Sequence, residues 1–170
     1  MDIILNRRSV RTFDLNKKIS YDELLTLCKY AEAAPSAKNQ RGREYIIVDD
    51  KNIIDKLSTI SNGSKVLLNC NTVIAVVGKN PENLATPLMQ PADLAAATEN
   101  ILLAATNMGF GSCWIGIHPI LDRMSSANDI LNLKDNKFCY SLIALGYPVD
   151  NDVFFDKNKF DINDIYHNKE

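Results

Sequence analysis

The chain has 170 residues and a mass of 19.0 kDa, which fits one ordinary domain and leaves little room for a second. Hydrophobic residues make up 46% and charged residues 24%, so the composition excludes a disordered or fibrous protein. The 19 Lys and Arg residues against 21 Asp and Glu residues give a net charge of −2, which provides no general attraction to nucleic acid or to an anionic membrane.

The N-terminal part is predicted to begin with helices. Residues 1–30 are expected to be helical, and a capping box over residues 20–23 starts an amphipathic helix within them. Pro35 ends this helix, because the residue before a proline is forced out of the helical region. A polar loop over residues 35–43 then leads into a β-branched strand at residues 45–48.

The middle of the chain alternates short elements with turns. A short helix is predicted at residues 52–57, followed by the turn sequence Ser-Asn-Gly-Ser at residues 61–64. Residues 72–77 are apolar on both faces, as in a central strand. Residues 80–91 contain three prolines and little periodicity, and are predicted to be a loop.

The strongest helical periodicity lies in residues 91–108, and its many alanines indicate a helix that is packed on several sides. A strand at residues 112–117, a helix at 121–131 and a strand at 140–145 follow, before a polar tail at 150–170. This order predicts an α+β fold in which helices wrap a short mixed sheet, with residues 1–170 forming one domain.

The sequence also predicts the compartment. No stretch reaches the roughly 20 apolar residues of a membrane span. Charged residues follow a short apolar run in residues 1–8, the reverse of a signal peptide. We therefore expect a cytoplasmic protein that binds neither a membrane nor nucleic acid.

The four cysteines (Cys28, Cys70, Cys113 and Cys139) are far apart, and no Cys-x-x-Cys pair occurs. We expect reduced and mostly buried thiols. The two histidines also stand alone, so no metal site is expected.

The first candidate binding motif is the basic cluster Arg7, Arg8, Ser9 and Arg11. Guanidinium groups donate in a planar fork that matches phosphate oxygens. If the segment is extended, Arg7, Ser9 and Arg11 point to the same side. The alternative interpretation of this cluster alone is a solvated basic surface.

Two further segments are rich in small residues or in glycine. Residues 34–40 form a loop of small residues and amides that could bind a planar ligand, or a plain polar connection between helices. Residues 109–116 contain Gly-x-Gly, but Trp114 replaces the third glycine of a dinucleotide motif, and the segment follows a helix and opens a strand. It is either a strand edge that a flat ring can approach, or a helix cap followed by a core strand. No P-loop or serine hydrolase motif occurs.

Taken together, these motifs resemble the nitroreductase family of flavin enzymes over nearly the whole chain. Five motifs occur in the family's order, at residues 7–13, 34–39, 93–102, 111–116 and 144–148. The resemblance implies an FMN enzyme with the nitroreductase fold.

The resemblance also implies the binding residues. Those that hold the FMN phosphate would be Arg7, Arg8, Ser9 and Arg11, completed by Lys157 and Lys159 near the C-terminus. The loop of Pro35, Ser36, Ala37 and Asn39 would reach the flavin of a second subunit. Trp114, Ile115 and Gly116 would lie beside flavin N5, with the backbone N–H of Ile115 as the donor.

The implied reaction is ping-pong hydride transfer from NADH or NADPH through FMN to a nitroaromatic, a quinone or a related flat acceptor. The cofactor supplies the reactivity, so no catalytic side chain is assigned. The resemblance further implies a homodimer with FMN at its interface. The tail carries spaced apolar residues without a periodic face, and we expect the two subunits to exchange it.

Two departures from the family are visible. After Asn39 the chain reads Gln-Arg-Gly-Arg, where relatives often have Gln-Pro-Trp. No long insertion follows Val77, so residues 80–91 are expected to take its place beside a more open site.

Two other functions fit the same sequence. One is a flavin-binding or flavin-handling protein of this fold without reductase turnover. The other is a regulatory module that binds a different phosphorylated ligand. A yellow purified protein would exclude the second.

Overall fold

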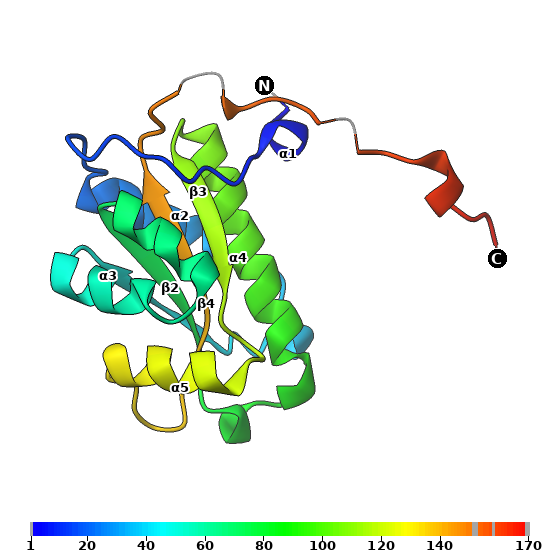
Figure 1. Cartoon of the computed structure of the whole chain (residues 1–170). Coiled ribbons are helices and arrows are strands. Elements are labelled where there is room, and N and C mark those ends of the chain that lie inside the picture. Colours follow the sequence, from blue (N-terminus) through cyan, green and yellow to red (C-terminus); the bar gives the residue numbers. More distant parts are fainter. Residues whose placement is uncertain (1, 151–152, 158, 169–170) are drawn as a thin grey trace.

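The computed structural model describes residues 2–150, 153–157 and 159–168. Figure 1 shows a sheet between layers of helices, with the C-terminal segment leading away from the body. The helices and strands are, in chain order, α1 (Ile3–Asn6), α2 (Tyr21–Glu32), β1 (Arg43–Val48), α3 (Lys51–Ser58), β2 (Thr72–Gly78), α4 (Gln90–Asn107), β3 (Gly111–Gly116), α5 (Leu121–Ile130) and β4 (Phe138–Gly146). The predicted α+β class is confirmed.

The four strands form one sheet in the order β1-β2-β4-β3, and every pairing among them is antiparallel. The expectation of a mixed sheet is therefore wrong for these strands. A parallel contact is present as an isolated bridge between Ser9 and Ser112. β2 is buried along its whole length, which confirms the predicted central strand.

Two apolar clusters hold the helices to the two faces of the sheet (Figure 1). On one face, Ile74 and Ile143 pack with apolar residues of α2 and α4. On the other face, Ala75 and Leu142 pack with α3, α5 and the turn that precedes β2. α4 is buried on several sides, as its alanines predicted, because small side chains let it approach both α2 and the sheet.

The N-terminal prediction is correct only in part. Ser20 and Glu23 form the predicted capping box at the start of α2. Residues 7–20, however, contain no helix, and Phe13 lies beside Pro148 in an isolated antiparallel bridge. The segment is extended because its backbone bonds to the body and not to itself: Val10 N–H donates to Ser112 O at 2.9 Å and Asp14 N–H donates to Tyr147 O at 2.8 Å, while Val10 and Phe13 are buried.

The other predicted elements are recovered with shifted ends. The turn at 61–64 opens a longer 3-10 segment, Asn62–Asn69. The loop at 80–91 contains two short 3-10 turns, Pro81–Asn83 and Pro87–Met89, and α4 begins at Gln90. Gln90 is buried and donates to the carbonyl oxygens of Gly42 and Lys79, which fixes the end of the loop to the sheet.

The four cysteines are free thiols. Burial raises the pKa of Cys70 to about 11 and that of Cys139 to about 12, so both are protonated at neutral pH. In the part of the chain that the structure describes, no group of three His, Cys, Asp or Glu side chains is placed to hold a metal ion. Within the same ranges, no helix has the length and apolar character needed to cross a membrane.

Candidate functional site

The segment after α1 and the start of the C-terminal tail line an open cavity of about 520 Å³. Arg8, Ser9 and Arg11 line it from one side, and Lys157 lines it from the tail. Its size is within the range of small-molecule sites, and the charged side chains that line it, Arg8, Arg11, Lys157 and Asp150, are positive in sum. This cavity is therefore suited to an anionic ligand.

Arg8 lies at the centre of this cluster. Its Nη1 and Nη2 donate to the carbonyl oxygens of Arg7 and Leu5 at 2.7 and 3.0 Å, and its guanidinium carbon lies 5.0 Å from the ring centre of Phe155. Its Nε is buried and has no hydrogen-bond partner among the described residues, and the same is true of Ser112 Oγ. Buried polar atoms without partners call for an explanation, such as a missing ligand or water.

Arg7 turns away from the larger cavity. Its Nε lies 3.2 Å from Glu99 Oε1 on α4, and it lines a second cavity of about 250 Å³ together with Arg8, Lys157 and Lys159. Burial raises the pKa of Glu99, while the charge of Arg7 lowers it. The expectation that Arg7 shares one side with Ser9 and Arg11 is wrong, because the carboxylate of Glu99 holds the Arg7 guanidinium against α4.

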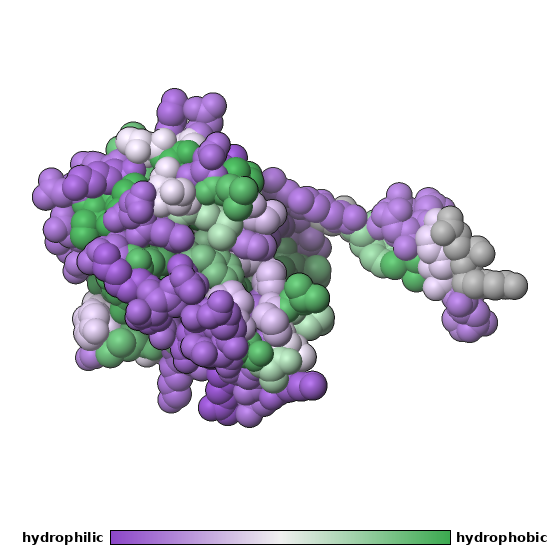
Figure 2. Space-filling model, turned by 90° about the horizontal axis from the view of Figure 1, so that it is seen from below, coloured by the Kyte–Doolittle hydropathy of each residue, from purple (hydrophilic) through white to green (hydrophobic). Residues whose placement is uncertain are grey.

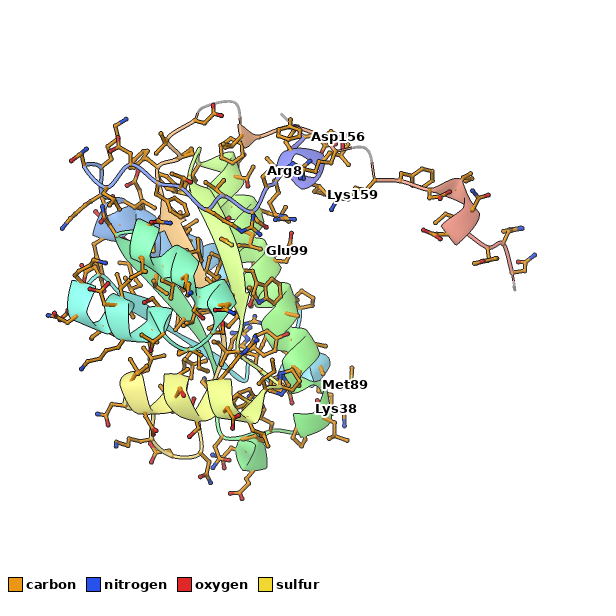
Figure 3. All side chains as sticks on the ribbon, in the orientation of Figure 1. Arg8, Lys38, Met89, Glu99, Asp156 and Lys159 are labelled. Carbon is orange, nitrogen blue, oxygen red and sulfur yellow. The ribbon has the colours of Figure 1, made fainter. Side chains whose placement is uncertain are left out.

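The structure brings the predicted basic residues together. Lys157 lines both cavities, and Lys159 lines the smaller one. Figure 3 shows Arg8, Asp156 and Lys159 gathered beside α1. The group comprises Arg7, Arg8, Ser9, Arg11, Lys157 and Lys159.

The next element is β3, whose outer edge adjoins this cluster. Val10 N–H donates to Ser112 O at 2.9 Å, so the N-terminal segment covers the first part of the edge. Ile117 N–H donates to Tyr140 O at 3.3 Å on the β4 side. The backbone N–H and C=O groups of successive residues point alternately to the two sides of a strand. Those of Ile115 therefore also point to β4, whereas those of Trp114 and Gly116 point away from the sheet. The Ile115 amide is thus placed in the sheet, and the amides on the open edge belong to Trp114 and Gly116.

Gly116 leaves space beside this edge. A Cβ atom at Gly116 would meet no atom within 4 Å, whereas one at Gly111 would lie 2.8 Å from Val10 Cγ1. The packing of the chain itself therefore requires glycine at position 111 but not at position 116. Gly116 O accepts from Arg123 Nη1 at 3.0 Å, while its N–H has no partner within the described residues. A ligand that approaches the backbone closely would account for this glycine.

Aromatic side chains flank the end of β3. Trp114 is partly buried, with its ring centre 6.2 Å from that of Tyr140, and the His118 ring stacks on Tyr140 at 5.5 Å. Burial lowers the pKa of His118 and raises the pKa of Tyr140, so both rings favour their neutral forms. The surroundings of Gly116 thus suit a flat, uncharged ring.

The loop of Pro35, Ser36, Ala37 and Asn39 lies elsewhere. Figure 3 shows Lys38 beside Met89 near the start of α4, well away from Arg8. The loop is bound to Asp93, six residues before the Glu99 that holds Arg7. Six residues correspond to about 9 Å along a helix and about 120° around it. Within one copy of the chain, the loop and the basic cluster therefore lie on different sides of α4.

Sequence reasoning assigned no role to four residues that organise these groups. Glu99 pairs with Arg7, Phe155 lies under Arg8, and Asp93 and Gln40 hold the loop. A carboxylate in the first turn of a helix was visible in the sequence at Asp93. The contacts of Glu99, Phe155 and Gln40 join residues far apart in the chain, so no local sequence pattern indicates them.

Comparison with known proteins shows what this chain resembles. The model of the nitroreductase family matches residues 4–67 and 62–147. A protein of Archaeoglobus fulgidus named "Putative NADH dehydrogenase/NAD(P)H nitroreductase" is 35% identical over 157 residues, 92% of this chain and 89% of that protein. The crystal structure of a "Putative NADH Oxidase" from Clostridium acetobutylicum has a TM-score of 0.93 and 36% identity, covering 99% of this chain and 100% of the other.

Two more distant proteins carry a flavin in their names. The "FMN reductase (NADPH)" of Bacillus subtilis is 25% identical over 166 residues, 87% of this chain and 65% of that protein. The crystal structure of "a putative nitroreductase in complex with fmn" from Desulfovibrio desulfuricans has a TM-score of 0.80 at 20% identity and covers 99% of this chain and 95% of the other. The latter likeness shows the fold alone.

Proposed function

Because this chain belongs to the nitroreductase family, we propose that it is an FMN-dependent NAD(P)H oxidoreductase that reduces nitroaromatics, quinones or related small flat acceptors. The names of its relatives support the cofactor and the electron donor. The observation that carries the proposal is the position of the cationic cavity beside the open edge of β3.

The cavity fits the phosphate end of FMN. Arg8, Arg11 and Lys157 supply positive charge and N–H donors, and Ser9 supplies a hydroxyl. The unpartnered Nε of Arg8 is a further donor at the same place. We assign the phosphate to these four residues, with Arg7 and Lys159 at the smaller neighbouring cavity.

The outer edge of β3 fits the flavin ring. From Ser112, where the covered part of the edge ends, the strand runs on to Gly116, about 14 Å at the usual rise per residue. In this arrangement Gly116 N–H, which faces outward, takes the place of Ile115 N–H as the donor toward flavin N5. Bound FMN supplies the hydride chemistry, accepting from NADH or NADPH and reducing the acceptor. The chain's own residues hold the cofactor and leave one ring face open.

We further propose a homodimer in which each copy completes the site of the other. The loop with Asn39 cannot serve the basic cluster of its own chain from the other side of α4, so it would serve the flavin of the second copy. The tail leads away from the body in Figures 1 and 2 and carries exposed apolar side chains. Phe160 is 71% exposed and Ile162 is 65% exposed, which a second copy would cover.

The test is rapid-mixing absorbance spectroscopy of the purified yellow protein. NADH or NADPH should bleach the bound flavin, and a quinone or nitroaromatic should restore its colour. Donor and acceptor should compete, since both must lie about 3–3.5 Å from the same ring for transfer. Reduction no faster than that of free FMN would show a flavin-binding protein without turnover, and a colourless protein that does not bind FMN would refute the proposal.

A further inference from the structure

The loop that follows α2 has an unusual backbone. Lys38, Asn39 and Arg41 have φ angles of 48°, 53° and 47°, in the left-handed region that glycine adopts easily and other residues rarely do. Three such residues within four positions do not keep this shape unaided. The surrounding structure must hold the loop.

A single buried carboxylate binds the loop on both sides of Lys38 and Asn39. Ala37 N–H donates to Asp93 Oδ1 at 2.9 Å, and Gln40 Nε2 donates to Asp93 Oδ2 at 2.7 Å. Asp93 is 7% exposed and lies in the first turn of α4, where the helix dipole favours a negative charge. Both oxygens of the carboxylate are thus used to fix the two residues between its partners.

The other end of the Gln40 amide joins the loop to the segment before α4. Gln40 Oε1 accepts from Thr86 N–H at 3.0 Å and from Thr86 Oγ1 at 2.9 Å. Its Nε2 also lies 3.2 Å from Thr86 O. Gln40 therefore links the loop to Thr86 and Asp93, which lie 46 and 53 residues further along the chain, and its orientation is set by both.

The result is a fixed direction for Asn39. Asn39 is exposed, and its Oδ1 accepts from Arg41 Nε at 3.0 Å. Because arginine can only donate, the amide nitrogen of Asn39 is the group left to face a ligand. It can donate to a carbonyl oxygen or ring nitrogen, the acceptors along the pyrimidine edge of a flavin.

We propose that Asp93 and Gln40 are positioning residues for the flavin ring: they hold the left-handed loop so that Asn39 donates to the ring and not to the phosphate. This inference rests on the proposed function, in which the loop meets the FMN of a second copy.

The experiment measures the affinity of the full-length protein for two flavins, FMN and riboflavin, which lacks the phosphate. In Asp93→Asn, the new amide NH₂ faces the NH₂ of Gln40, so one hydrogen bond must be lost. We expect about tenfold weaker binding of both flavins by the same factor. The double variant Asp93→Asn/Gln40→Glu restores a donor–acceptor pair between positions 93 and 40 and should recover most of the lost affinity, although position 40 no longer donates to Thr86 O. Asp122→Asn, at the same turn of α5, is the matched control and should change neither affinity.

The visible circular dichroism of the bound flavin gives a second readout, which should change in Asp93→Asn and return in the double variant. Three results would overturn the inference: Asp93→Asn weakens the binding of FMN alone, it changes neither affinity, or it lowers both affinities and the double variant recovers neither. If Asp93→Asn does not fold, Gln40→Leu removes the same hydrogen bond to the loop and should weaken the binding of both flavins by the same factor. Failure of the wild-type protein to bind either flavin would instead refute the proposed function.

Discussion

Both edge strands of the sheet, β1 and β3, have backbone groups that point outward, but the surfaces beside the two edges differ. Lys79 N–H donates to Gly42 O, which sets the alternation of β1 so that the backbone of Tyr45 and Ile47 faces outward, as that of Gly116 does on β3. Apolar grooves of about 440 and 290 Å³ flank the β1 edge. The β3 edge adjoins the cationic cavity.

This difference indicates different occupants. An open strand edge between apolar grooves is suited to another strand, whose alternate side chains fill the grooves. An edge with an outward glycine amide beside basic residues is suited to a small anionic molecule. We therefore expect β1 to bind the tail of a second copy and β3 to bind FMN. The following variants test this division.

The largest effect is expected from removing residues 150–170. Without the tail, nothing covers the grooves at β1, so light scattering at micromolar concentration should show a monomer. FMN affinity should fall by about a hundredfold, because Lys157 and the partner's contribution are both lost. The control Lys157→Ala/Lys159→Ala keeps the apolar tail and should remain dimeric. A truncated protein that is still dimeric would contradict tail exchange.

A proline at position 47 tests the β1 edge directly. The N–H of Ile47 faces outward, so Ile47→Pro removes no bond to β2, but it blocks pairing with an added strand. We expect a folded protein whose dimer dissociates about a hundredfold more readily in sedimentation experiments. Ile46→Pro, one residue earlier, removes a bond to β2 and should lower the melting temperature instead. Equal behaviour of the two variants would show that the edge is not an interface.

On the β3 side, Arg11→Ala should weaken FMN binding by about tenfold or more, since a charge-assisted bond to phosphate is lost. Arg7→Ala should have a smaller effect, because Arg7 is held by Glu99, a half-exposed pair worth at most about 1 kcal/mol. Fluorescence titration of the apo-protein with FMN measures both. The reverse order would place the phosphate in the smaller cavity.

Substitution of Gly116 should separate binding from stability. A Cβ there meets nothing in the chain, so Gly116→Val should leave the unfolding free energy within about 0.5 kcal/mol of wild type. It should weaken FMN binding about fivefold, because the added side chain blocks the approach of the flavin ring. Gly111→Ala, whose Cβ would meet Val10, should lower stability. Unchanged FMN affinity in Gly116→Val would show that the flavin ring does not bind at the edge of β3.

The smallest effect is expected away from both edges. Ser20→Ala removes the cap of α2 and should cost about 1 kcal/mol of stability, without changing FMN binding or the dimer. Hydrogen bonds from Ser20 lower the pKa of Glu23, so their contribution is present above the ordinary carboxyl pKa of 4.5 and is lost as the pH falls through the folded value. Urea unfolding at neutral and at acidic pH should show the difference between wild type and variant shrinking in acid.

The sequence by itself determined the features that depend on neighbouring residues. The capping box at Ser20, the helix over α4 and the apolar strand β2 follow from local spacing, and the structure contains all three. The basic cluster was also visible, because its residues are adjacent and their chemistry does not depend on the fold.

The tertiary structure decided which of these residues face the same space. Arg7 turns to Glu99 while Arg11 lines the cavity, and an ion pair across the fold is invisible in a local pattern. The alternation of β3 is in the sequence, but its register with β4 decides that Ile115 faces inward and Gly116 outward. Asp93 likewise becomes important only when Ala37 and Gln40 are brought to it. Contacts between distant segments depend on the packing of the whole chain, and for that reason short-range sequence patterns do not specify them.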